Sequence, residues 1–117
     1  MKYLLMIYGN EAAIKSASKA ETDQMLAAYG AYLEAMTKAG IMLGRGRLQP
    51  SSTATTVRIT NGKTQVLDGP YAETKEQLGG YVLIDVPDLD TALSWATRCP
   101  GAHSGVMEVR PIWEMPG

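Results

Sequence analysis

The sequence predicts an α+β domain in which a strand–helix–strand unit occurs twice, with a β-hairpin between the two units. Two stretches with apolar residues at helical spacing, one from Glu21 to Gly40 and one from Asp88 to Cys99, each lie between strand-like stretches. Asn61-Gly62 separates two further strand-like stretches, and this dipeptide is the strongest short signal for a hairpin turn. The length of 117 residues fits one domain, residues 1–117, with one modest core.

The first half of the chain predicts strand, helix and strand. Lys2 to Tyr8 is rich in Tyr, Leu and Ile and ends at a Gly-Asn turn signal, which predicts a strand. Residues 11–20 are small and polar with no clear period, so the first helix is expected to begin near Glu21 and to end at Gly40. The apolar face of this helix consists of Met25, Tyr29, Tyr32, Leu33 and Met36. A strand with an irregular end follows from Ile41, and a loop covers residues 49–52.

The second half predicts a hairpin and then a second strand–helix–strand unit. Thr55 to Thr60 and Lys63 to Leu67 form the hairpin, and Leu78 to Val86 forms a strand. The continuous apolar run at 81–84 indicates a central strand with both faces covered. Asp88 is a good N-cap for the second helix, whose apolar face consists of Leu89, Ala92, Leu93 and Ala96. Residues 106–113 alternate as a last strand, in which Pro111 indicates a sheet edge or a strand end.

Composition excludes several classes of protein. Eleven basic and twelve acidic residues leave a net charge of -1, with no Lys/Arg block of the kind that nucleic-acid binding requires, so no nucleic-acid partner is expected. The apolar run at the amino terminus is too short for a signal peptide or a membrane span. The single cysteine, Cys99, has no second thiol and is interpreted as structural. We therefore expect a cytoplasmic protein without cofactor or bound metal.

The predicted order of elements corresponds to a ferredoxin-like plan with an extra hairpin between its halves. Helices cover one face of a mainly antiparallel sheet in this plan, and the other face is left open. An open face with apolar residues must be buried in some way. We therefore expect a homodimer.

The connection from Asp68 to Glu76 is the principal candidate site, because it places several ionisable side chains beside Gly69-Pro70 between two strands. Asp68 has two interpretations. It is either a turn former that accepts backbone hydrogen bonds or a general acid or base in a partly enclosed site. Tyr71 likewise either packs its ring or offers its hydroxyl as a hydrogen-bond partner.

Other candidate residues surround this turn. Glu73, Thr74 and Lys75 form either a solvated connection or a cluster of donors and acceptors suited to an anionic or carbonyl-bearing ligand. Three more candidates are considered for positive charge and proton transfer: Arg45, Arg110 and the only histidine, His103. Arg110 is expected to pair with Asp68 or with Glu108 of a partner subunit. His103 lies in a glycine-rich stretch that predicts a loop.

The turn, together with the Gln-Leu-Gly-Gly-Tyr stretch at 77–81, resembles the signature of the YCII-related family. The resemblance is to the branch that carries Asp-Gly-Pro-Phe, with Tyr71 here in place of Phe. Residues 83–93 with Trp95, and residues 106–111, are less specific parts of a resemblance that spans Tyr3 to Arg110. It implies a dimeric α+β barrel in which two sheets face one another. The family is associated with a histidine from the first helix paired with an aspartate, and this helix contains no histidine.

Two functions are compatible with these observations. The first is a small enzyme that binds an organic molecule in a barrel cleft and uses Asp68, with Tyr71 or His103, for proton transfer. The second is a noncatalytic module that binds a metabolite or a protein. Relatives with this turn are often encoded beside extracytoplasmic-function sigma factors, so the resemblance also implies a link to transcriptional regulation.

Overall fold

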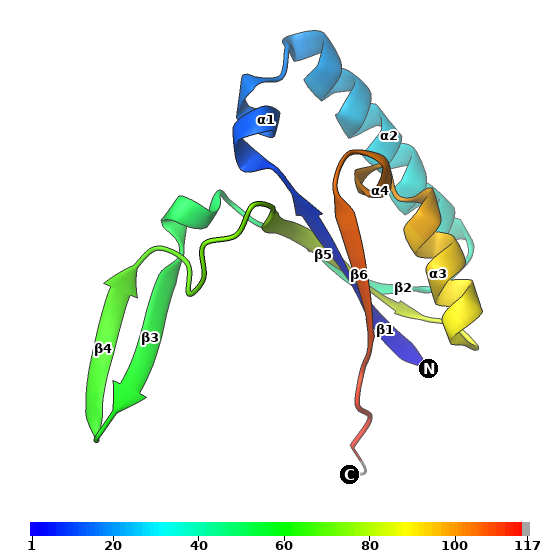
Figure 1. The fold of residues 1–117 in the computed structure, drawn as a ribbon. Coiled ribbons are helices and arrows are strands. Elements are labelled where there is room, and N and C mark those ends of the chain that lie inside the picture. Colours follow the sequence, from blue (N-terminus) through cyan, green and yellow to red (C-terminus); the bar gives the residue numbers. More distant parts are fainter. Residues whose placement is uncertain (116–117) are drawn as a thin grey trace.

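The main sheet has four antiparallel strands in the order β2-β5-β1-β6, as predicted for a ferredoxin-like α+β fold. The computed structural model describes residues 1–115, so the last two residues of the predicted domain lie outside the described part. The four strands are β1 (Lys2–Gly9), β2 (Met42–Arg47), β5 (Gln77–Asp85) and β6 (Val106–Pro111). Helices α2 (Lys19–Lys38) and α3 (Leu89–Arg98) lie side by side on one face (Figure 1).

Two helix starts differ from the prediction because short capping signals decide them. Residues 11–20 were expected to lack a helix, yet α1 (Glu11–Ser16) forms where the Asn10 side chain accepts a hydrogen bond from Ala13 N at 3.0 Å. Helix α2 begins before Glu21 because Ser18 and Glu21 form a capping box. The prediction of a loop around His103 was wrong, since this stretch contains a short helix, α4 (Gly101–Ser104). The last strand ends at Pro111 and not at residue 113, and it lies at the sheet edge, so the prediction made from Pro111 is confirmed.

The core lies between the sheet and its two helices. Alternate residues of β1 and β5 face the helices, and the buried cluster consists of Tyr3, Leu5, Tyr32, Met36, Val82, Ile84, Val86, Ala92 and Cys99. The central position of β5 is confirmed, because it pairs with both β1 and β2. Its other face is not covered within the chain, since the Tyr81 side chain is 37% exposed there.

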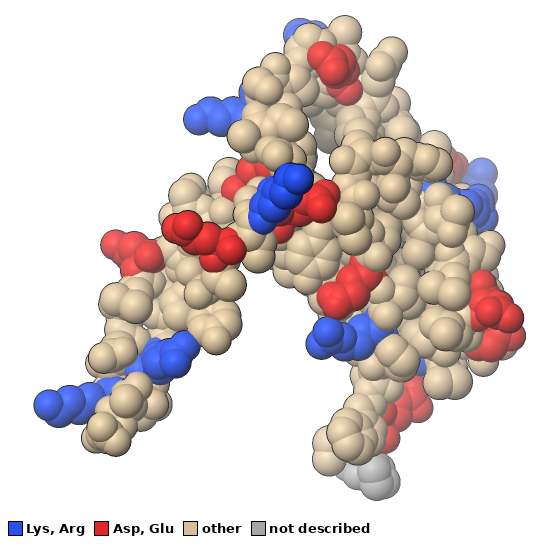
Figure 2. Space-filling model, viewed as in Figure 1, with Lys and Arg blue, Asp and Glu red and all other residues tan. Residues whose placement is uncertain are grey.

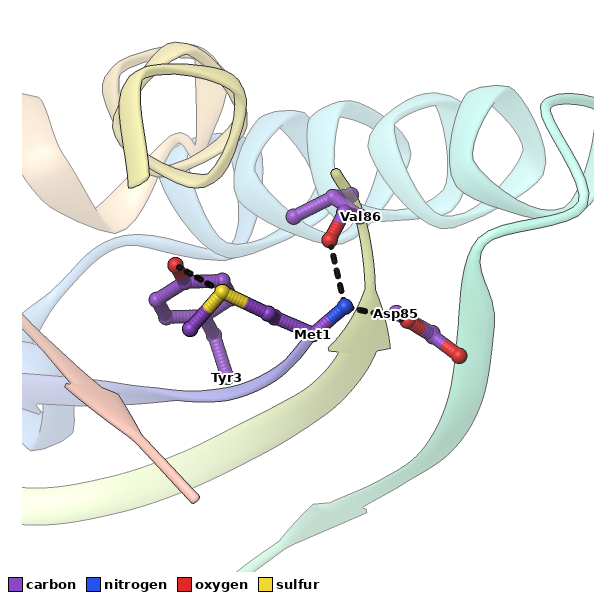
Figure 3. A network of polar contacts seen from close by, with 4 residues as sticks. All are labelled: Met1, Tyr3, Asp85 and Val86. Carbon is purple, nitrogen blue, oxygen red and sulfur yellow. Dashed lines mark hydrogen bonds and ion pairs between the residues drawn. The ribbon is translucent and has the colours of Figure 1, made fainter. Parts of the chain in front are cut away.

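The opposite face of the sheet is open and largely apolar. Strand alternation and the printed register place five residues of the two central strands on it: Leu4, Met6, Tyr8, Tyr81 and Leu83. At one end of this face the amino group of Met1 pairs with the Asp85 carboxylate at 3.0 Å and donates to Val86 O at 2.9 Å (Figure 3). These two contacts join the start of β1 to the end of β5.

The predicted hairpin forms a separate arm. Strands β3 (Thr55–Thr60) and β4 (Lys63–Asp68) pair only with each other and project away from the main sheet (Figure 1). Asn61 and Gly62 have φ angles of 51° and 75°, as the tight turn between them requires. With the arm, the molecule extends 48 × 47 × 18 Å and forms a flat arch. Among residues 1–115, no helix is long and apolar enough to cross a membrane.

Candidate functional site

The turn from Gly69 to Glu76 leads from the arm back into β5 and lies beside the segment that follows β2. Gly69 adopts a φ of 99°, a conformation that favours glycine, and its N–H donates to Ala54 O at 2.7 Å. Its carbonyl accepts a hydrogen bond from Thr56 Oγ1 at 2.8 Å. The base of the arm and the start of the turn are thereby held together.

Two adjoining hollows lie between this turn and the segment from Leu48 to Ala54. The larger has a volume of about 580 Å³ and is lined by Tyr8, Leu48, Gln49, Pro50, Ser51, Thr53, Ala54, Pro70, Tyr71, Ala72, Thr74, Gln77 and Leu78. The smaller, of about 340 Å³, is lined by Ser51, Ser52, Pro70, Ala72, Glu73, Thr74 and Gln77. No charged side chain lines the larger hollow, and Glu73 is the only one that lines the smaller.

A hydrogen-bond network connects the walls of the larger hollow, which we call the turn groove. The Glu11 carboxylate accepts from Ser51 N and from Ser51 Oγ, both at 2.7 Å, and so holds the 3₁₀ helix η1 (Ser51–Thr53) against α1. Gln77 Oε1 accepts from Glu11 N at 3.0 Å, and Gln77 Nε2 donates to Thr74 O at 2.7 Å. The Thr74 hydroxyl donates to the carbonyl of Glu76. Three segments distant in sequence, around Glu11, Ser51 and residues 74–77, are thus joined beside one groove.

The groove brings together some of the residues predicted from the turn. Tyr71 and Thr74 line the turn groove, and Glu73 and Thr74 line the smaller hollow. The Tyr71 ring lies beside Arg58, whose guanidinium carbon is 5.4 Å from the ring centroid. Lys75 is exposed and lines neither hollow.

Asp68 lies at the end of β4, is exposed and lines neither hollow. Its carboxylate forms no ion pair with a residue of the described chain. In the register of the arm it lies opposite Thr55, on the face that does not carry the Thr56 hydroxyl contact. Within one copy of the chain, Asp68 therefore does not reach the groove beside it.

The remaining candidates also lie away from the groove. Arg45 is exposed on β2, and His103 is exposed on α4. The Arg110 guanidinium pairs with the Glu108 carboxylate of its own chain at 3.1 Å, not with Asp68. These three cationic or titratable side chains do not converge with the turn in a single copy.

Several residues of the groove were not singled out from the sequence. Tyr8 enters because it pairs with Leu78 across β1 and β5, and Glu11 and Ser51 belong to segments without periodicity. Among these residues, only Gln77 could have been predicted from the sequence, because it directly follows the turn. The others are brought there by pairing and packing that no local pattern shows.

Cys99, Tyr29 and Tyr32 lie together in the core between the sheet and the helices. Burial raises the pKa of the Cys99 thiol and the pKa values of the Tyr29 and Tyr32 hydroxyls. The Tyr32 hydroxyl donates to Trp95 O at 2.8 Å, and Cys99 Sγ lies 3.8 Å from the Tyr29 hydroxyl. A thiol that is fully buried and held protonated is structural, as the sequence predicted.

Comparison with known proteins agrees with the fold. The chain is 39% identical over 114 residues to an uncharacterised protein of Rhizobium meliloti (strain 1021), covering 96% of this chain and 92% of that protein. Its fold is similar to that of 5-chloro-2-hydroxyhydroquinone dehydrochlorinase (TftG) from Burkholderia phenoliruptrix AC1100, solved in complex with 2,5-dihydroxybenzoquinone. The TM-score is 0.58 at 16% identity, over 99% of this chain and 96% of that one. The family model of the YCII-related domain matches residues 1–116, and the chain therefore belongs to the YCII-related family.

Proposed function

We propose that this protein binds a small organic molecule in the turn groove. The groove itself carries the proposal, because a hollow of about 580 Å³ has the size of a small-molecule site. Its lining surface is largely apolar, and polar groups come from Tyr8, Gln49, Ser51, Thr53, Tyr71, Thr74 and Gln77. Such a lining suits a compact ring compound that carries hydroxyl or carbonyl groups, because the apolar walls take the ring and the polar groups orient its substituents.

The favoured activity is that of a small enzyme that moves protons on such a compound. The structural neighbour TftG is a dehydrochlorinase whose structure holds a dihydroxybenzoquinone, and this supports the same class of ligand. Asp68 remains the proposed general acid or base, since it is the carboxylate that begins the turn. His103 and the cationic residues Lys75, Arg45 and Arg110 remain secondary proposals for proton transfer or ligand contact.

A second function is favoured by a different observation. Because no charged side chain of the same chain lines the turn groove, the groove can bind a neutral metabolite without any group placed for acid–base catalysis. The protein would then be a noncatalytic binding module. Association with a sigma factor stays a prediction from the family resemblance.

The open face of the main sheet supports a homodimer. Leu4, Met6 and Leu83 are only partly buried there, and Tyr81 lies over Gly46, where an added Cβ would come within 2.6 Å of its ring. An apolar sheet face of this kind is stable in water only when another surface covers it. We propose that the same face of a second copy covers it, which gives the α+β barrel expected for the family.

A ligand-observed NMR screen of phenols, quinones and hydroxy acids tests the binding proposal. We expect compounds that bind the parent protein but no longer bind Ala72→Leu. The Ala72 side chain lines both hollows, and a leucine side chain at this position would fill them. Ala27→Leu, on the exposed side of α2, is the matched control and retains binding. A screen without binders, or binding that survives Ala72→Leu, contradicts the proposal. Following each bound compound over time in the parent and in Asp68→Asn then separates turnover from simple binding.

A further inference from the structure

The β3–β4 arm is covered by no other element among residues 1–115. Every residue of its two strands is exposed except Thr56, which is half-buried. The space-filling view shows the arm standing apart from the body, with open space between them (Figure 2). A two-stranded hairpin on its own is at best marginally stable in water, so an arm of this kind needs a second surface.

The two faces of the arm differ. The face that carries Thr56 and Arg58 contacts its own chain, through the Thr56 hydrogen bond to Gly69 O and the contact of Arg58 with the Tyr71 ring. The other face carries Val57, Ile59 and Val66, which alternation and register place side by side. Their side chains are 62%, 69% and 62% exposed. We call this apolar side the free face of the arm.

The area of the molecule indicates how much surface a partner must cover. The described structure has an accessible surface of 8434 Å². A compact monomer of 12.6 kDa has about 6,200 Å², so about 2,200 Å² is in excess. The radius of gyration of 16.3 Å likewise exceeds the value of about 13 Å for a compact domain of this length. A standard interface covers about 800 Å² on each partner, and obligate dimers cover more.

The open sheet face alone is too small to account for this excess. Four strands spaced about 4.8 Å apart, with about seven residues each, make a face on the order of 460 Å² in projection. The arm is the element that projects furthest from the body in Figure 1. A second copy of the chain is the occupant that needs no further partner, because a twofold pair covers both arms and both sheets by the same contacts.

We propose that the free face of the arm docks on a second copy of this chain and presents Asp68 to it. Asp68 lies on the free face, since it is paired with Thr55 and separated from Val66 by one residue. Its carboxylate therefore points toward whatever covers the arm, away from the groove of its own chain. In a twofold pair each copy gives its Asp68 to the other, so the site is incomplete in one copy. This inference rests on the homodimer proposed above.

Site-directed photocrosslinking tests the arm contact. The native Cys99 is fully buried and is expected not to react, so Val57→Cys, Asp68→Cys and the control Thr60→Cys are each labelled with benzophenone maleimide and irradiated. Positions 57 and 68 are on the free face and are expected to yield a covalent dimer. Position 60 is exposed on the opposite face and is expected to yield none.

The outcomes separate the arm from the dimer itself. Light scattering on the same samples reports the oligomeric state. A dimer without crosslinks from position 57 overturns the arm contact and leaves the sheet-to-sheet dimer standing. Crosslinks from 57 without crosslinks from 68 overturn the delivery of Asp68. A monomer in light scattering overturns both proposals.

A shortened arm provides a second, independent test. Replacing residues 57–66 by Asn-Gly joins the paired residues Thr56 and Leu67 through a two-residue hairpin turn and leaves the base of the arm intact. We expect the dimer dissociation constant to rise at least about tenfold. A dissociation constant equal to that of the parent contradicts the proposal, provided that circular dichroism shows the same helix content.

Discussion

Removal of the contact between Glu11 and Ser51 is expected to lower the stability of the protein and the order of the turn groove. Glu11→Ala removes the acceptor of two hydrogen bonds, to Ser51 N and Ser51 Oγ, each 2.7 Å long. Hydrogen bonds to a charged group contribute about 1.5–3 kcal/mol each. Because this site is only partly buried, the freed groups regain water, and we expect a total loss of about 2 kcal/mol.

Two further variants separate this contact from general surface charge. Glu11→Gln keeps the shape and one acceptor, and about 1 kcal/mol of loss is expected. Glu34→Ala is the control, because Glu34 forms an exposed ion pair with Lys38 at 3.2 Å, and such pairs contribute below about 0.5 kcal/mol. Ligands found for the turn groove are expected to bind more weakly to Glu11→Ala, since η1 forms one of its walls.

Urea unfolding followed by circular dichroism measures these differences at one fixed protein concentration, because the stability of the proposed homodimer would depend on concentration. With a slope of about 2 kcal/mol per molar urea, the Glu11→Ala midpoint is expected to fall by about 1 M. A midpoint within about 0.2 M of the parent would refute the reasoning. A Glu34→Ala loss as large as that of Glu11→Ala would refute it as well.

Two further predictions concern the body of the domain. Gly105→Ala is expected to lower the free energy of unfolding by about 3 kcal/mol, measured by thermal unfolding, because the added Cβ would lie 2.1 Å from a backbone oxygen of β1. Gly44→Ala is the control and is expected to be tolerated, because its added Cβ would meet no atom within 4 Å. Burial raises the pKa values of Tyr29 and Tyr32 above 10.0 and that of Cys99 above 9.0, so the unfolded chain loses these protons first. Stability is therefore full below about pH 9 and falls as the pH rises beyond it, and a urea midpoint that stays constant between about pH 8 and pH 11 would contradict this.

Local patterns were sufficient for most of the fold. Strand-forming composition, a continuous apolar run at 81–84 and alternation at 106–113 predicted the strands, helical spacing predicted both long helices, and Asn61-Gly62 predicted the hairpin. These signals succeed because backbone preferences act over a few residues. The helix α1 was missed since its Asn10 cap precedes a segment without an apolar period. In that segment the hydrogen bond of the helix cap, and not the burial of an apolar face, accounts for the helix.

By itself, the sequence determined the ferredoxin-like α+β fold and the YCII-related family, and it singled out a chemically rich turn after Asp68. Only the tertiary structure decided that β5 is covered on one face, that Ser51 and Gln77 line the groove and are held by Glu11, and that Asp68 points away from it. The reason is physical: strand pairing joins segments far apart in the chain, and a shift of one residue in register turns a side chain to the other face.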